Sequence, residues 1–260
     1  MSEECNNPYS SLLVDCNDAL KRSAEFLQLA LDGVPPVERA YLRQYYLVQQ
    51  AKSVASVAQD VHLLVKHERF QNVVGLCRLG FESRIHVYAA MKVPDFAAQK
   101  YLAQAKGNVQ NAEEIVAGGF KSAEFKQELE NQRNMVEQMR RDFSGVRERQ
   151  WKISEAAVAA GLKADYDQHY DLLSKAAHNT PTGLASKDDR RIVASSVLRL
   201  FHDTVQTCAC LVFFRERDDS KPQPMTENWL QLTGPVRDLT AEYGQLSERL
   251  NKLFKDEFGI

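Results

Sequence analysis

Hydrophobic residues recur along most of the chain with a period near 3.6, which is the period of an α-helix that buries one face. No segment shows the sustained two-residue alternation, bounded by Gly or Asn turns, that is typical of β-hairpins. The pattern therefore predicts an all-α fold, a multi-helix bundle of about eight helices without significant sheet.

Proline, glycine and polar residues mark the expected helix ends. We expect helices over residues 11–31, 37–67, 69–93, 96–117 and 122–143, a short one ending at Gly161, and further helices over 164–179, 187–214 and from Pro235 onward. The helix over 122–143 carries many charges and is expected at the periphery, whereas the helix that opens at Ser186 should be largely buried.

The segment 218–224, Asp-Asp-Ser-Lys-Pro-Gln-Pro, has the composition of a linker. We therefore predict a helical bundle domain over 1–217, a linker and short segment over 218–234, and an amphipathic helix over 235–260. The apolar face of that last helix packs either on the bundle or on a partner chain, which would give a homo-oligomer.

Composition fits an ordinary globular protein, because 26% charged and 44% hydrophobic residues argue against both disorder and a membrane protein. The net charge of −2 gives no bulk attraction to nucleic acid or to an anionic membrane. The first residues, MSEECNNPYSS, are acidic and polar where a signal peptide would be basic and then apolar. We expect a cytoplasmic protein without membrane association.

Five cysteines form an odd set without CxxC spacing, which argues against a disulfide framework and against a zinc finger. We expect these thiols to be buried and reduced, and we expect neither a metal nor another cofactor.

The third expected helix carries the first candidate site. A helical wheel gives it apolar residues around most of its circumference, except for a strip about 80° wide made by Arg78, Glu82 and His86. If this strip is the exposed edge of a core helix, Arg78 and Glu82 form an ordinary surface ion pair. If it faces into the protein, other polar groups must meet it, because an unpaired buried charge is costly.

A second polar strip lies on the helix over 164–179, where Tyr170, Ser174 and His178 recur at the same spacing. The adjoining arc is apolar, so Ser174 and His178 should lie at the rim of the buried surface. A histidine there would equally suit the helix C-terminus, where a cation complements the helix dipole. If the two strips form one site, at least one direct or water-bridged hydrogen bond should join the two helices.

The segments Gly75-Leu-Cys-Arg-Leu-Gly-Phe-Glu-Ser-Arg and Tyr170-Asp-Leu-Leu-Ser-Lys-Ala-Ala-His-Asn-Thr-Pro-Thr-Gly together resemble the prokaryotic family called domain of unknown function five-six-seven-seven. That family pairs an Arg-x3-Glu helix with a Tyr-x3-Ser-x3-His helix, and the likeness covers about residues 38–214. The resemblance implies an all-helical bundle and nominates Arg78, Glu82, Tyr170, Ser174 and His178. The wheel adds His86.

Such bundles also resemble the HEPN helical superfamily, whose nuclease members act on RNA through an Arg-x4–6-His motif. No histidine of this chain has an arginine at that upstream spacing, and Arg78 to His86 misses it by one residue. This departure argues against nuclease activity of that kind.

Other chemistries have weaker support. Ser174, His178 and Glu82 could act as nucleophile, base and orienting group, but no Gly-x-Ser-x-Gly elbow accompanies them. His86 and Glu82 with a distant His178 could hold a metal, but such spacings are common by coincidence. A glycine loop that could cradle phosphate is missing from the sequence.

The leading hypothesis is a protein that binds or processes a phosphate-bearing ligand, RNA or a nucleotide, at this inter-helix site. Arg78 would hold the anion and His178 would move protons, since its side chain titrates nearest neutral pH. The catalytic candidates are His178, Arg78 and Glu82, and the ligand-binding candidates are Tyr170, Ser174 and His86. The alternative is a non-catalytic interaction or regulatory protein, in stress or phage defence, whose polar residues specify helix register. The residues leave open whether the protein is an enzyme.

Overall fold

The structure is a computed structural model that describes residues 7–34, 42–120, 122–178, 187–216 and 227–259. Within these ranges, the side chains at 171–172, 174–178, 187–189, 213–216 and 227–231 are not described.

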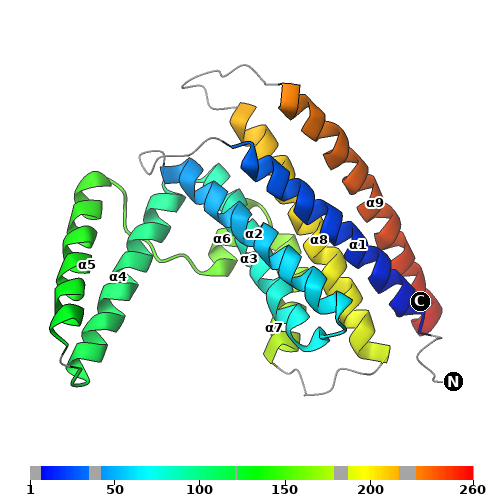
Figure 1. Ribbon diagram of the computed structural model, residues 1–260, viewed down its shortest axis with the longest axis horizontal. Helices are drawn as coiled ribbons and strands as arrows, with labels where there is room; N and C mark the ends of the chain where they lie inside the picture. The colour runs from blue at the N-terminus through cyan, green and yellow to red at the C-terminus, as the bar shows by residue number, and fades with distance from the viewer. Residues whose placement is uncertain (1–6, 35–41, 121, 179–186, 217–226, 260) are drawn as a thin grey trace.

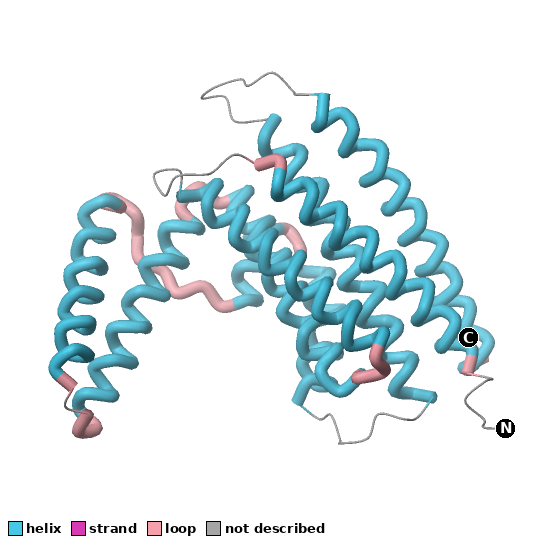
Figure 2. Tube along the Cα trace, viewed as in Figure 1, coloured by secondary structure: helices cyan, strands magenta, loops and turns pink. Residues whose placement is uncertain are grey.

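The described residues form nine α-helices and one short 3-10 helix, and no strand occurs among them (Figures 1 and 2). The helices are α1 (Pro8–Asp32), α2 (Leu42–Lys66), η2 (Phe70–Asn72), α3 (Val73–Lys92), α4 (Phe96–Ala117), α5 (Ala123–Asp142), α6 (Ile153–Ala160), α7 (Lys163–His178), α8 (Lys187–Glu216) and α9 (Glu227–Phe258). The all-α prediction is confirmed. None of the helices in the described ranges combines the length and apolar character that crossing a membrane requires.

Local chemistry sets the ends of two helices. The helix α1 begins at Pro8, three residues earlier than predicted, because proline suits the first helical turn and the Asn7 side chain accepts a hydrogen bond from the Tyr9 amide at 3.0 Å. The helix α6 ends at Gly161, whose φ of 72° lies in the left-handed region that glycine adopts without strain.

The last helix begins at Glu227, so the prediction that it starts at Pro235 is wrong. Proline inside a helix removes one backbone hydrogen bond and crowds the preceding turn. Here the helix continues through it, because Leu232 and Val236 on either side of the proline both pack against a cluster of buried residues to which α1, α2 and α8 contribute. The predicted linker over 218–224 lies outside the described residues.

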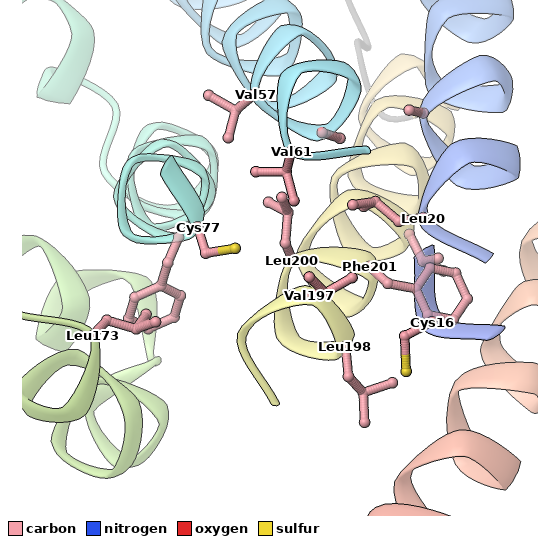
Figure 3. Packing of buried hydrophobic residues seen from close by; sticks show 14 of the residues in the cluster. Cys16, Leu20, Val57, Val61, Cys77, Leu173, Val197, Leu198, Leu200 and Phe201 are labelled. Atoms are coloured by element: carbon pink, nitrogen blue, oxygen red, sulfur yellow. The ribbon is translucent and has the colours of Figure 1, made fainter. Parts of the chain in front are cut away.

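Four helices, α1, α2, α3 and α8, pack against one another and enclose the main core (Figure 1). The helix α9 covers α1 and α8 from outside, while α6 and α7 pack on α3. Figure 3 shows Val57 and Val61 of α2, Cys77 of α3, and Leu200 and Phe201 of α8 meeting in this interior. The predicted burial of α8 is thereby confirmed.

The helices α4 and α5 form an antiparallel arm that stands apart from the main bundle (Figure 1). The helix α5 packs on α4 and buries Leu129 and Val136 alone among its residues. The expectation of a peripheral fifth helix is confirmed.

Four of the five cysteines lie in the described part of the chain, and all four are buried and free: Cys16, Cys77, Cys208 and Cys210. Burial raises the pKa of the Cys210 thiol to about 11. A thiol with such a pKa stays protonated at neutral pH and packs as a small apolar group, as predicted.

Candidate functional site

The two predicted polar strips meet in a closed triangle of hydrogen bonds between α3 and α7. The Arg78 guanidinium donates from Nε to Glu82 Oε1 at 3.0 Å and from Nη2 to the Tyr170 hydroxyl at 2.7 Å. That hydroxyl in turn donates to Glu82 Oε1 at 3.0 Å. The predicted contact between the two helices is confirmed.

Tyr170 is the member of the second strip whose side chain the structure describes. The side chains of Ser174 and His178 lie outside the described residues, although both belong to α7. Their part in the site stays a prediction from the sequence.

Water reaches the triangle but does not surround it. The side chains of Arg78 and Glu82 are each 25% exposed, so the strip is neither an open surface edge nor a fully buried patch. Burial raises the pKa of Tyr170 above its ordinary value, and the Glu82 carboxylate raises it further. The Tyr170 hydroxyl therefore keeps its proton at neutral pH and can donate it in a hydrogen bond.

Two further residues adjoin the triangle. The ring of Tyr166, one turn before Tyr170 on α7, stacks on it with centroids 4.6 Å apart and planes 20° from parallel. The half-buried ammonium of Lys100, on α4, lies near Glu82. Burial lowers the pKa of Lys100, and Glu82 partly offsets this effect. The site thus combines two cations, one carboxylate and a pair of aromatic rings.

His86 lies at the inner end of the strip, with its ring 5.8 Å from that of Phe96 and 6.4 Å from that of Tyr46. Burial lowers the pKa of His86 to about 4, and the nearby Lys100 contributes to this shift. The imidazole is therefore neutral at physiological pH. Its predicted role in binding a ligand stays a prediction.

The wheel analysis missed a second polar cluster, which joins the opposite side of α3 to α7 and α8. Arg84 Nη1 donates to Asp203 Oδ1 at 2.7 Å, and Arg84 Nη2 donates to Asp165 Oδ2 at 3.2 Å. Arg199 Nη2 donates to the same Asp165 oxygen at 2.9 Å, and Arg199 Nε lies 3.1 Å from Asp203 Oδ1. Two arginines and two aspartates thus form one ring of ion pairs.

This ring is far more buried than the Arg78 triangle. The side chains of Arg84 and Asp203 are 4% and 0% exposed, whereas that of Asp165 is 34% exposed. Burial opposes ionisation of Asp203, but Arg199 and Arg84 outweigh it and lower the pKa of this carboxyl to about 2. All four groups are therefore charged at neutral pH, and their charges cancel.

Two histidines border the ring. His202 Nδ1 lies 3.7 Å from Asp203 Oδ1. Burial lowers the pKa of His169 to about 4, and the positive charge of Arg199 adds to this effect. Among the described residues, no group of three or more His, Cys, Asp or Glu side chains is arranged to hold a metal ion.

A signal for this cluster was present in the sequence. Arg199 and Asp203 stand four residues apart in the middle of α8, among the apolar residues Leu198, Leu200 and Phe201, where charge requires a partner. Arg84 likewise lies one helical turn from the apolar residues Phe81, Val87 and Tyr88 of α3. Our wheel described only the strip that contains Arg78, and so the prediction that α3 is apolar outside that strip is wrong.

The chain was compared with known protein families, and a family model matches it. A family model described as a family of unknown function, DUF5677, matches residues 44–191, which is more than half of the 260 residues. The chain belongs to this family. No curated protein and no solved structure matches it.

The DUF5677 match runs from α2 into the first turns of α8 and includes the whole Arg78–Glu82–Tyr170 triangle. Arg84 and Asp165 lie inside the match as well, whereas Arg199 and Asp203 follow its end. The likeness to the HEPN superfamily stays a prediction from the sequence.

Proposed function

We propose that this DUF5677 protein binds a phosphate-bearing ligand, a nucleotide or an RNA strand, at the site formed by α3, α4 and α7. The observation that carries the proposal is the Arg78–Glu82–Tyr170 triangle, which holds an arginine in a fixed position while leaving a quarter of its side chain exposed. Planar guanidinium groups held in this way are well suited to binding phosphate.

The charges around the triangle support an anionic ligand. Arg78 and Lys100 carry two positive charges against the single negative charge of Glu82, so the described residues of the site have an excess of one positive charge. The half-buried position of Lys100 strengthens its attraction for an incoming anion, because the local dielectric constant is lower than that of water.

The aromatic pair favours a nucleotide over a simple phosphate ester. Tyr166 and Tyr170 are both half-buried and stacked, and bases of single-stranded nucleic acids commonly stack on exposed aromatic rings. In this arrangement the Tyr170 hydroxyl donates its one proton to Glu82 and accepts from Arg78, so it holds the arginine in place for the phosphate. We assign proton transfer to His178, on the sequence argument alone, should the ligand be processed and not only bound.

The proposal is tested by measuring the binding of AMP, ADP and a fluorescently labelled short single-stranded RNA. We expect Arg78→Gln to weaken binding at least about tenfold, since losing one charge-assisted contact costs about 1.4 kcal/mol or more. Arg133→Gln on α5 is the matched control, because Arg133 is also bonded to glutamates but lies on the arm. Wild-type protein that binds none of these ligands would contradict the proposal, as would equal losses in both variants.

The second candidate function is the non-catalytic interaction or regulatory protein. The buried ring of Arg84, Asp165, Arg199 and Asp203 favours it, because such networks fix how helices pack without any ligand. We keep a role in stress or phage defence, and a cytoplasmic location, as parts of this proposal. A folded protein that binds no phosphate compound but captures a partner protein would favour this candidate.

A homo-oligomer formed through the apolar face of α9 has less support. Leu239, Leu246 and Leu250 on that face are already buried within the single chain, where α9 packs on α1 and α8. Self-association would therefore have to use another surface or displace α9.

A further inference from the structure

The ring of ion pairs and the Arg78 triangle both bind α7, at two different positions along its axis. Arg84 and Arg78 both lie on α3 and are six residues apart, which corresponds to about 9 Å along the helix. Their partners on α7, Asp165 and Tyr170, are five residues apart, or about 7.5 Å. The later residue of α3 bonds the earlier residue of α7, so the helices are antiparallel and both contacts fit one register.

The two contacts lie on different sides of α7. Five residues correspond to a rotation of about 140° around the helix axis, so Asp165 and Tyr170 point in different directions from α7. Neither side chain can therefore make the contacts of the other. If α7 rotated about its axis or moved along α3, the Arg84–Asp165 contact or the Arg78–Tyr170 contact would break, even if the other one remained. Together the pairs fix both the rotation and the height of the helix.

Among the side chains of α7 that the structure describes, few bury apolar surface completely. Leu173 is 3% exposed, but Tyr166 and Tyr170 are only half-buried. Asp165, in the first turn, is the residue of α7 that two arginines from two other helices bind at once. A carboxylate in this turn also interacts favourably with the helix dipole.

Charge balance makes Asp165 hard to replace. With it, two guanidinium groups face two carboxylates. Without its charge, Arg84 and Arg199 would share Asp203 alone, and one positive charge would stay uncompensated in a buried place. The first turn of α7 would then lose its two ionic links to α3 and α8.

We infer that Asp165 is a positioning residue, which acts through Arg84 and Arg199 to set the rotation and height of α7 and thereby places the Tyr170 hydroxyl between Arg78 and Glu82. The consequence for ligand binding rests on the proposed function, whereas the positioning itself does not.

The experiment compares the change in Tm that Tyr170→Phe causes in wild type with the change that it causes in Asp165→Asn protein. This change keeps the ring and removes the hydroxyl, which both accepts from Arg78 and donates to Glu82. Because these two hydrogen bonds lie in a partly exposed place, we expect the change to lower the Tm of wild type by about 2–4 °C. In Asp165→Asn protein the hydroxyl no longer reaches Arg78 and Glu82, so the same change should lower the Tm by less than half as much. The Tm of the Asp165→Asn protein itself should also fall.

Asp167→Asn is the matched control, because Asp167 is on the same helix and is also paired, but with the exposed Lys163. Tyr170→Phe should keep its full effect in that background. Asp165→Glu, which restores the charge, should recover most of the effect of Tyr170→Phe. The inference is overturned if Tyr170→Phe lowers the Tm equally in the Asp165→Asn and Asp167→Asn backgrounds. An aspartate that supports only overall stability would give changes that add to that of Tyr170→Phe.

Should Asp165→Asn fail to fold, Arg199→Lys serves as the background, because it keeps the buried charge and loses the planar fork. We then expect a partial reduction of the Tyr170→Phe effect, and an unreduced effect would contradict positioning. The same variants are measured with labelled RNA, where the loss of affinity caused by Tyr170→Phe should shrink in parallel. If wild type binds no ligand, the proposed function fails, while the Tm comparison still decides on Asp165.

Discussion

Arg78 and Arg84 lie six residues apart on one helix, and both bind carboxylates. Their side chains differ in solvent exposure, because Arg78 is partly exposed and Arg84 is buried. The Arg78 side chain and its partner Glu82 are each a quarter exposed, so either group can be solvated if the other is lost. The Arg84 side chain is 4% exposed and its partner Asp203 is fully buried. Losing Arg84 therefore leaves two carboxylates, Asp165 and Asp203, with Arg199 as their one remaining guanidinium in the ring, and water cannot reach Asp203.

This difference predicts unequal costs of removing the two arginines. Arg78→Ala should lower the free energy of unfolding by about 1–3 kcal/mol, the cost of a broken, partly solvated hydrogen-bond network. Arg84→Ala should lower it by about 3–5 kcal/mol, as for a broken buried ion pair. The double change Arg78→Ala with Glu82→Ala should lose less than the sum of the single changes. Urea unfolding of these variants measures all three values, and equal costs for the two arginines would refute the comparison.

The two arginines also differ in how far their partners could be predicted from the sequence. The Arg78–Glu82 pair could be predicted, because both partners lie on one helix at a spacing of four. The partner of Arg84 stands 119 residues further along the chain, and no helical wheel relates one helix to another. The apolar neighbours of Arg84 showed that it is buried, but only the packing of α3 on α8 shows that its partner is Asp203.

At the scale of helices, the close approach of α3 and α8 depends on Gly80. A Cβ atom placed on this residue would lie 2.4 Å from Leu200 Cδ1 and 3.5 Å from Val57 Cγ1. Leu200 is fully buried, so its side chain has little room to move aside. Glycine at this point of a helix therefore serves packing, although it weakens the helix itself.

We predict that Gly80→Ala lowers the free energy of unfolding by about 1–3 kcal/mol, the usual cost of overpacking a core. Gly107→Ala on α4 is the control, because no atom lies within 4 Å of the Cβ that it would gain. That change should stabilise the protein by about 0.5–1 kcal/mol, through the better helix propensity of alanine. Denaturant unfolding of both variants tests the pair, and a neutral Gly80→Ala would show that α3 and α8 can separate without cost.

Helix ends were predictable where one strong signal decides them. The bounds of α4 agree with the prediction, because Pro94 precedes the helix and Gly118 follows it. The start of α9 could not be predicted in this way, because the local effect of Pro235 is opposed by the packing of Leu232 and Val236, both partly buried, against other helices. Tertiary packing of this kind cannot be seen in the local sequence pattern.

For the molecule as a whole, periodicity was enough to predict an all-α fold and the exposed character of α5. It did not predict that α4 leaves the bundle together with α5 to form an arm (Figure 1). The buried apolar residues of α4 lie mainly in its first half, which includes Phe96, Ala97 and Leu102, whereas Ala112 is the one buried residue of the second half. A helix anchored at one end can project from a bundle, but its direction depends on the contacts at the anchored end.

Acidification should act on the whole bundle through half-buried histidines. The pKa of His86 is lowered to about 4 by burial and by Lys100, so the folded protein holds this imidazole neutral, whereas the unfolded chain binds a proton below about pH 6.5. A depressed pKa in the folded state gives stability that is fully present above pH 6.5 and is lost as the pH falls toward 4. The aromatic rings of Tyr46 and Phe96 offer the imidazolium no charged partner to offset this loss.

We therefore predict that the free energy of unfolding declines between pH 6.5 and 4, and that His86→Phe makes this decline shallower. His169, whose pKa is also lowered to about 4, should account for part of the slope that the variant retains. The exposed His67 provides the control, since His67→Gln should leave the slope as it is in wild type. Denaturant unfolding at a series of pH values measures the slopes. If His86→Phe and wild type decline in parallel over this range, His86 is protonated in the folded protein as readily as in the unfolded chain, and its surroundings do not keep it neutral.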